Sequence, residues 1–163
     1  MTATPSNQAE VAGATAPPAS VSAPEDGPWF TVKRSGKKPL RFRGVQLAEA
    51  TSWRLGSPLW HEIALYRRTR GDVVAAVTVF KKAAQERDVF RAESFGSLEE
   101  AALFLEGYDP TGDLTPGFDP DDPSLGAAQL ALCAAGLRQR AEQTQRDYQA
   151  LLGDLLYQLD LTE

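Results

Sequence analysis

Residues 60–80, WHEIALYRRTRGDVVAAVTVF, constrain the fold of this chain more than any other stretch. In the first half Ile63 and Leu65 alternate with polar or small residues, and the second half is an almost unbroken β-branched run from Val73 to Val79. Gly71 supplies the positive φ that a short turn between two strands needs. The stretch therefore predicts an antiparallel hairpin that turns within residues 68–72.

Three further strands are predicted, two before this hairpin and one after it. Residues 29–33 form a short candidate strand, residues 89–95 form another, and residues 40–47 alternate apolar and basic side chains at period two. This alternation places Leu40 and Phe42 on one face of the sheet and Arg41 and Arg43 on the other. Gly44 would permit a bulge or a bend in this strand. Together the patterns predict an antiparallel sheet of four or five strands.

A short helix is predicted over residues 98–106. Ser97 is a suitable N-cap, and Glu100 is placed to reach back to it as in a capping box. Gly107, with Pro110 just beyond it, provides the stop signal. We expect this helix to lie across the sheet and to cover the face that carries Leu40 and Phe42.

The rest of the chain divides into an acidic linker and a long helix. Residues 108–124, YDPTGDLTPGFDPDDPS, contain four prolines and five aspartates, which predict a linker without regular structure. Residues 125–160 predict one long helix. Its apolar positions follow alternating steps of four and three, so the helix could self-associate along a narrow seam or fold back onto its own sheet. The candidate self-association residues are Leu130, Leu137, Tyr148, Leu151 and Leu155.

The domain organisation follows from these assignments. Residues 1–27 are rich in Ala, Pro, Ser and Thr and lack aromatic residues, so they predict a disordered tail. The sheet domain spans 28–107, followed by the linker at 108–124 and the long helix at 125–160. The fold class is therefore α+β: a four- or five-stranded antiparallel sheet covered by a short helix, with a long C-terminal helix.

Composition excludes several classes of site. The single cysteine, Cys133, leaves no internal disulfide and no multi-cysteine zinc centre, and His61 is the only histidine. Both residues are expected to be structural. The chain has no phosphate-binding loop and no nucleophile elbow, so no cofactor, no metal and no catalytic residue is predicted. With neither a signal peptide nor a run of apolar residues long enough to cross a bilayer, we expect a cytoplasmic protein without a membrane partner.

Charge is distributed unevenly along the chain. Residues 28–91 carry 14 Lys and Arg against 5 Asp and Glu, whereas residues 92–163 carry 3 against 14. The two halves could neutralise each other across the fold, or they could present oppositely charged surfaces to different partners. Charge alone leaves both alternatives open.

The basic half also contains the aromatic residues Trp53, Trp60 and Tyr66 among its arginines and lysines. This combination is typical of single-stranded nucleic-acid binding. Arginine and lysine would contact phosphates, and Trp53 and Tyr66 would stack on bases. The alternative is that the aromatic rings fill the core and the arginines form a solvated face. The candidate nucleic-acid-binding residues are Arg41, Arg43, Trp53, Tyr66, Arg67, Arg68, Arg70, Lys81 and Lys82.

Two functions of different classes follow. The first is a non-catalytic, self-associating binding protein whose basic sheet face docks an anionic partner, with nucleic acid as the leading candidate. The second is an adaptor that captures a helical protein partner, or a second copy of the chain, through its C-terminal helix. An enzyme would need a concave pocket with convergent polar groups, which the sequence does not reveal.

Overall fold

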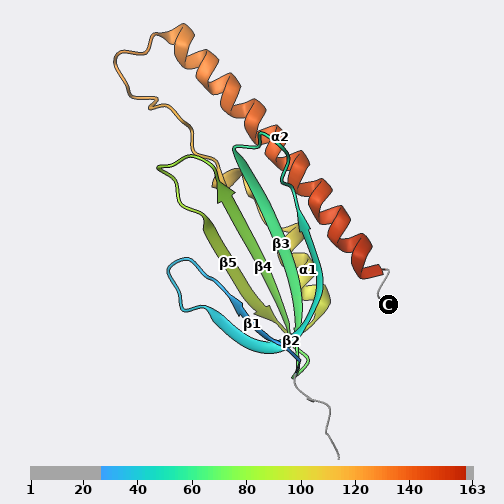
Figure 1. The fold of residues 1–163 in the computed structure, drawn as a ribbon. Coiled ribbons are helices and arrows are strands. Elements are labelled where there is room, and N and C mark those ends of the chain that lie inside the picture. The colour runs from blue at the N-terminus through green and yellow to red at the C-terminus, as the bar shows by residue number, and fades with distance from the viewer. Residues whose placement is uncertain (1–26, 161–163) are drawn as a thin grey trace, which may run out of the picture.

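The computed structural model describes residues 27–160 of the 163-residue chain. Five antiparallel strands form one sheet in sequence order, packed with two α-helices and a short 3-10 helix (Figure 1). The predicted α+β class, with an antiparallel sheet and a long C-terminal helix, is confirmed. The predicted disordered tail lies outside the described residues, apart from Gly27. The elements are β1 (Trp29–Val32), β2 (Leu40–Thr51), β3 (Leu59–Arg68), β4 (Val73–Lys81), β5 (Val89–Phe95), α1 (Leu98–Glu106), η1 (Pro110–Asp113) and α2 (Ala127–Asp160).

The hairpin of β3 and β4 forms the centre of the sheet. Its strands pair in unbroken register from Leu59 opposite Lys81 to Arg67 opposite Val73. At the turn, Gly71 has a φ of 101° and donates its N–H to the carbonyl of Arg68 at 2.8 Å. A positive φ of this kind is unstrained only in glycine, so the turn requires the residue found there.

A bulge in β2 changes which face its side chains occupy. The pairing of β2 with β3 shifts between Gln46, which lies opposite Tyr66, and Ala48, which lies opposite Leu65. Residues 46 and 48 would share a face in a regular strand, but the extra residue places them on opposite faces. Even-numbered residues of β2 therefore point away from the helices before the bulge, as Phe42 does, and toward the helices after it, as Ala48 does.

This bulge overturns the predicted environment of Leu40 and Phe42. Both residues pack in a cluster on the sheet face opposite the helices, not beneath α1. A bulge or bend was expected at Gly44, but the bulge lies farther along β2, between Gln46 and Ala48. Gly44 has a different role, because a Cβ at this position would lie 2.1 Å from the carbonyl oxygen of Arg67. Only glycine allows β2 and β3 to approach so closely.

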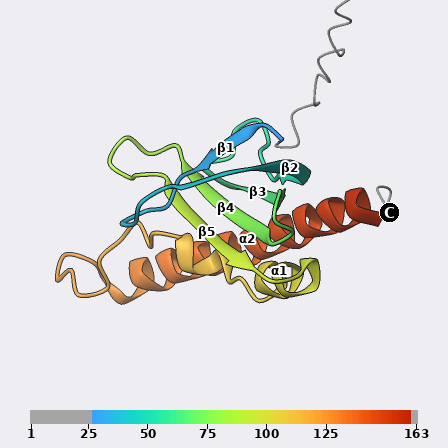
Figure 2. The ribbon, with the colours of Figure 1, turned by 90° about the horizontal axis from the view of Figure 1, so that it is seen from below.

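Two hydrophobic clusters occupy the two faces of the curled sheet. The larger lies between the sheet and both α-helices, and the smaller lies on the other face, beneath the β1–β2 arm (Figure 2). The larger cluster includes Ile63, Leu65, Val73, Val77, Ala101, Leu105, Tyr148, Leu151, Leu155 and Leu159. The smaller contains Phe42, Val74, Ala76 and Ala92, with Phe30, Val32, Leu40 and Tyr66 packed against it.

Helix α1 begins with the predicted cap, in a slightly different form. The Ser97 hydroxyl accepts a hydrogen bond from the Glu100 N–H at 3.2 Å. The Glu100 carboxylate reaches back to the N–H of Gly96 at 2.9 Å, one residue before the expected partner. Both side chains thus satisfy backbone donors at the start of the helix, which stabilises it.

The acidic segment before α2 is more ordered than its prolines predict. It contains the 3-10 helix η1, in which Pro110 and Asp113 are buried. Asp109 caps this helix by accepting a hydrogen bond from the N–H of Thr111 at 2.9 Å. A turn that starts with proline tolerates the missing N–H, so the residue expected to prevent regular structure here begins it.

Helix α2 packs on the sheet through its C-terminal half only. Tyr148, Leu151, Leu155 and Leu159 are buried in the larger cluster, and the Tyr148 hydroxyl donates to the Leu105 carbonyl at 2.8 Å. The N-terminal half continues past the end of the strands (Figure 1). With 34 residues the helix is about 51 Å long at 1.5 Å per residue, which exceeds the length of the strands it covers.

Replacing Leu155 should therefore test the docked half of α2. Leu155 is fully buried, so Leu155→Ala should cost about 2–5 kcal/mol in the free energy of unfolding. Leu132→Ala is the matched control, because Leu132 is 74% exposed and should change stability by less than about 0.5 kcal/mol. Urea denaturation followed by circular dichroism measures both. Equal losses in the two variants would contradict the docking.

Candidate functional site

The predicted basic and aromatic residues separate into two groups at opposite ends of the sheet. The arginines of β2 and of the β3–β4 turn lie at one end, and Trp53, Lys81 and Lys82 lie at the other. Eight residue steps along β3 separate these ends, or about 27 Å at 3.4 Å per residue. Tyr66 belongs to neither group, because its ring packs 4.9 Å from that of Phe30 in the smaller cluster. The nine residues therefore do not form one surface.

The arginine end contains a shallow groove of about 310 Å³. We call it the arginine groove, and it is lined by Trp29, Arg41, Phe42, Arg43, Arg68, Thr69 and Arg70. Four of the nine predicted residues meet here. Trp29 was not among them, because the residues it contacts, Arg41 and Arg43, are 12 and 14 positions away in sequence. The cross-strand pairing of Trp29 with Arg43 is what brings these side chains together.

Trp29 organises the two arginines of β2. The Arg41 guanidinium carbon lies 4.8 Å from the centre of the Trp29 ring, and that of Arg43 lies 4.9 Å from it. Both distances are within the range of cation–π attraction. Trp29 itself is 55% exposed, so the group sits at the surface. The edge of the stacked Arg41 guanidinium carries N–H donors of the kind that bind an anion.

Arg68 has a structural role at the base of the groove. Its side chain is only 12% exposed; one terminal nitrogen lies 3.1 Å from a carboxylate oxygen of Asp72, and the other donates to the Ser94 hydroxyl at 2.8 Å. Its guanidinium also lies over the Phe42 ring at 5.1 Å. Arg68 thus joins β3, β5 and the β3–β4 turn. We therefore treat it as a residue that supports the groove.

Arg70 is the exposed arginine of the turn. Its guanidinium makes two hydrogen bonds to the Asp72 carboxylate, at 2.9 and 3.3 Å, while 73% of the side chain remains exposed. The hydrogen bond from Arg70 lowers the pKa of Asp72 below its ordinary value, against the opposing effect of burial, and the charges of Arg68 and Arg70 reinforce it. Asp72 therefore stays ionised and fixes the position of the turn arginines.

Arg67 projects from what we call the outer face of the curled sheet, the face that carries Val73 and that packs against the helices farther along β3. It pairs with Val45, two residues along β2 from Arg43, so the alternation of side chains places Arg67 on the same face as Arg41 and Arg43. Arg67 is exposed and makes no ion pair within residues 27–160. It extends the positive charge of the arginine groove along the outer face.

The positive charge of the first half is neutralised only in part by the acidic half. Within residues 27–160, three ion pairs join a lysine or arginine of the first half to a carboxylate of the second: Lys37–Glu93 at 3.4 Å, Arg54–Asp147 at 3.2 Å and Arg91–Asp113 at 3.2 Å. None of them lies in the arginine groove. The carboxylate paired with Arg68 and Arg70 in the groove is Asp72, which belongs to the first half of the chain.

A buried polar cluster joins β3 to η1 and α2. The His61 Nε2 lies 2.9 Å from one Asp113 oxygen, which also accepts a hydrogen bond from the Tyr108 hydroxyl. Arg91 donates to the other Asp113 oxygen at 3.2 Å. His61 was expected to be structural, whereas Asp113 was hidden among the carboxylates of the predicted linker. Neither residue lines the arginine groove, and the cluster serves to hold η1 against the sheet.

Ionisation in this cluster follows from its contacts. Burial opposes ionisation of Asp113, but the hydrogen bonds with His61 and Tyr108 and the charge of Arg91 outweigh it, so the pKa of Asp113 is lowered. Burial and the neighbouring Asp113 raise the pKa of the Tyr108 hydroxyl far above its ordinary value, and the same causes raise the pKa of Tyr148. Asp113 is therefore a carboxylate and both tyrosines are neutral at neutral pH.

Comparison with known proteins identifies no relative: no family model, no curated protein and no solved structure matches the chain. Within residues 27–160 no three His, Cys, Asp or Glu side chains are grouped so that they could hold a metal ion. Neither α-helix in this part of the chain has the length and apolar composition needed to cross a membrane. Function must therefore be argued from the surfaces themselves.

Replacing Asp113 should change the acid stability of the protein. Because its folded pKa lies below the unfolded value, Asp113 stabilises the protein above about pH 4, and this contribution is lost as the pH falls through the folded pKa. Asp113→Asn should cost about 1–3 kcal/mol at pH 7 and flatten the stability profile between pH 5 and about pH 2. Thermal unfolding across this range measures the effect. The exposed Asp121→Asn is the control, and the same profile in both variants would contradict the role of Asp113.

Proposed function

We propose that the protein is a non-catalytic binding protein that docks an anionic partner on the arginine groove and the adjoining outer face, with single-stranded nucleic acid favoured. The observation that carries this proposal is the stack of Arg41 and Arg43 with the half-exposed ring of Trp29. Nucleic-acid binding requires cations for phosphates, and flat surfaces add affinity for bases. The groove offers both at one end of the sheet.

The contacts assign different roles within this surface. Arg41 and Arg67 are exposed and make no ion pair in the described part of the chain, so we assign them phosphate contacts. Arg70 is oriented by Asp72 and adds charge at the rim, whereas Arg68 supports the groove from beneath. Trp29 holds the arginines in place, which reduces the conformational entropy that they lose when they bind an anion.

The remaining candidates lie outside this surface. Trp53 and Lys82 are exposed at the far end of the sheet, and Lys81 lies 3.4 Å from Glu86. A nucleic acid would have to extend about 27 Å along the sheet to reach them from the arginine groove. We therefore assign the primary contacts to the arginine end.

Nucleic-acid binding can be tested by fluorescence anisotropy with labelled single-stranded and duplex DNA and RNA. The double variant Arg41→Glu with Arg67→Glu should weaken binding at least tenfold at low salt. It should also reduce the slope of log K against log salt by about 0.7 for each phosphate contact that is lost with a single strand. Arg138→Glu, on the exposed part of α2, removes the same type of charge elsewhere and should leave the slope unchanged.

Two results would contradict the proposal. The first is the absence of binding by the wild-type protein at low salt, where attraction to phosphate is least screened. The second is a loss of binding free energy in the Arg138 control about half as large as in the double variant, which would show that only net charge matters. Circular dichroism spectra of all variants establish that they remain folded.

The exposed half of α2 supports a second candidate, association through this helix with another copy or a helical partner. Leu130 and Leu137 of the predicted seam are half-buried on the projecting part of the helix, and Leu132 is 74% exposed. The other three predicted seam residues are Tyr148, Leu151 and Leu155, which are buried against their own sheet. Those three pack within the chain, as the fold-back alternative required.

Leu137→Glu tests this second candidate without disturbing the core. If the projecting half of α2 associates, Leu137→Glu should shift the protein toward the monomer in sedimentation equilibrium, because a charge at the seam opposes burial. Gln139→Glu places the same charge on the exposed side of the helix and serves as the control. A wild-type protein that is monomeric at high concentration would contradict self-association.

A further inference from the structure

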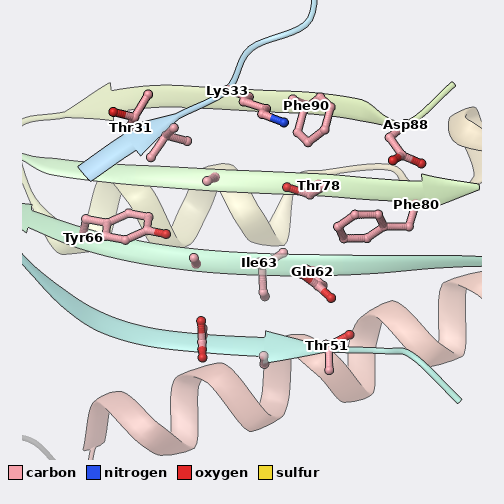
Figure 3. Close-up of a pocket in the computed structure, with 15 residues that line it drawn as sticks. Thr31, Lys33, Thr51, Glu62, Ile63, Tyr66, Thr78, Phe80, Asp88 and Phe90 are labelled. Carbon is pink, nitrogen blue, oxygen red and sulfur yellow. The ribbon is translucent and has the colours of Figure 1, made fainter. Parts of the chain in front are cut away.

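The sheet encloses a second and larger hollow on the face opposite the helices. The β1–β2 arm arches over this face and reaches β5, where Ser35 donates its N–H to the Phe90 carbonyl at 2.8 Å and Phe90 donates its N–H to the Ser35 hydroxyl at 2.9 Å. The space beneath has a volume of about 660 Å³. Binding sites for small molecules typically fall between about 300 and 1,000 Å³. We call this hollow the cup (Figure 3).

Small residues on the central strands form the floor of the cup. Ala64 of β3 lies directly opposite Ala76 of β4, and both line the floor together with Thr78. At the neighbouring end of the same face, the rings of Phe30, Phe42 and Tyr66 fill the space, with centroids 4.9–5.8 Å apart. Large side chains fill one end of this sheet face. The alanine end has room for a small molecule.

Aromatic rings form part of the wall. Tyr66, Phe80 and Phe90 line the cup, and Trp60 stacks on Phe80 with the ring centroids 5.2 Å apart. The Nζ of Lys33 lies over the Phe90 ring at 5.2 Å. One aromatic face of the cup is therefore already engaged by a cation of the protein itself, which shows that the geometry suits a cation–π contact.

The charge of the cup is opposite to that of the arginine groove. Three carboxylates line it, those of Glu49, Glu62 and Asp88, against one cation, Lys33. Glu62, Asp88 and Lys33 are labelled in Figure 3. Burial raises the pKa of the Tyr66 hydroxyl, and the negative charge of Glu49 adds to the shift, so this phenol is neutral. An anion or a nucleic acid entering the cup would meet repulsion from all three carboxylates.

We propose that the cup binds a small organic cation, an amine or guanidine carried on a flat apolar body. The apolar body would lie against the ring of Phe80, above the alanine floor. The carboxylates would supply the counter-charge, and Thr31, Thr51 and Thr78 provide hydroxyls along the wall. This site differs from the arginine groove in place, sign of charge and class of ligand, so the two proposals stand or fall separately.

Three probes with the same phenyl body test the ligand class. Phenethylamine is a cation at pH 7, 2-phenylethanol is neutral and 3-phenylpropionate is an anion. In titrations of the ¹⁵N-labelled full-length protein followed by NMR, phenethylamine should bind at least tenfold more tightly than the alcohol, and the propionate should not bind. The largest amide shifts should occur at Ala64, Ala76 and Thr78, which form the floor.

Two substitutions, one that removes a negative charge and one that removes a positive charge, test whether the charges of the cup determine the affinity for the cation. Glu62→Gln removes a carboxylate and should weaken phenethylamine binding at least threefold, whereas Lys33→Gln removes the internal cation and should strengthen it at least twofold. Glu142→Gln, on the exposed surface of α2, is the matched control and should leave the affinity unchanged. Both cup residues are exposed, so these variants are expected to fold.

Several outcomes would overturn the proposal. They are equal binding of all three probes, the absence of phenethylamine binding, shifts concentrated away from the cup, and a Glu62 variant that behaves like the Glu142 control. A filled cup gives a further check, since Ala76→Phe should abolish binding if thermal unfolding shows that the variant is folded. If Ala76→Phe does not fold, the pair of charge variants still decides the question.

Discussion

The fold depends on the path of β2, which bends so that one strand serves both layers of the protein. Its early residues contribute Phe42 to the cluster beneath the β1–β2 arm, and after the bulge Ala48 joins the core under the helices. Gly44 lets β2 lie close to β3 just before the bulge, because any side chain there would collide with the backbone of Arg67.

The curled sheet separates two surfaces of opposite charge, the arginine groove and the cup with its carboxylates. Side chains alternate along β2, so Arg41 and Arg43 point outward while Phe42 points inward. The outward arginines meet Trp29 at the surface, and the carboxylates of Glu49 and Glu62 line the inner face. A chain with an acidic total charge can thus present a strongly basic surface locally. Local charge, more than total charge, determines which partner approaches each surface.

The sequence predicted what depends on local pattern. The Gly71 turn and the Ser97 cap are each specified within a few residues, and both were predicted. The strands are also local patterns, and the sequence predicted four or five of them where the structure has five. The bulge was not located, because its residues, Gln46 and Leu47, carry no glycine or other local signal. The position of the bulge in turn decides the face that Leu40 and Phe42 occupy, so one local feature misplaced two core residues.

The candidate sites depended on contacts between distant residues. Trp29 meets its arginines only after β1 and β2 pair, and Asp113 meets His61 across 52 positions of sequence. Asp113 was indistinguishable by sequence from the four other aspartates of its segment. One signal could have helped, since the paired small residues Ala64 and Ala76 interrupt a run of larger residues at the centre of the sheet. In a strand, such a gap indicates either a close neighbour or an empty space.

Helix α2 shows how a docked segment can hold an exposed one in place. Its C-terminal half is anchored by Leu151 and Leu155, and by Gln158, whose amide bonds the backbone of Glu49 at 2.9 and 3.3 Å. The exposed half is continuous with this anchor and gains a further tie where Arg140 donates to the Pro116 carbonyl at 2.8 Å. A helix fixed at its C-terminal end and tied again near its middle presents its exposed side chains in a defined direction, so a partner would lose little entropy in meeting them.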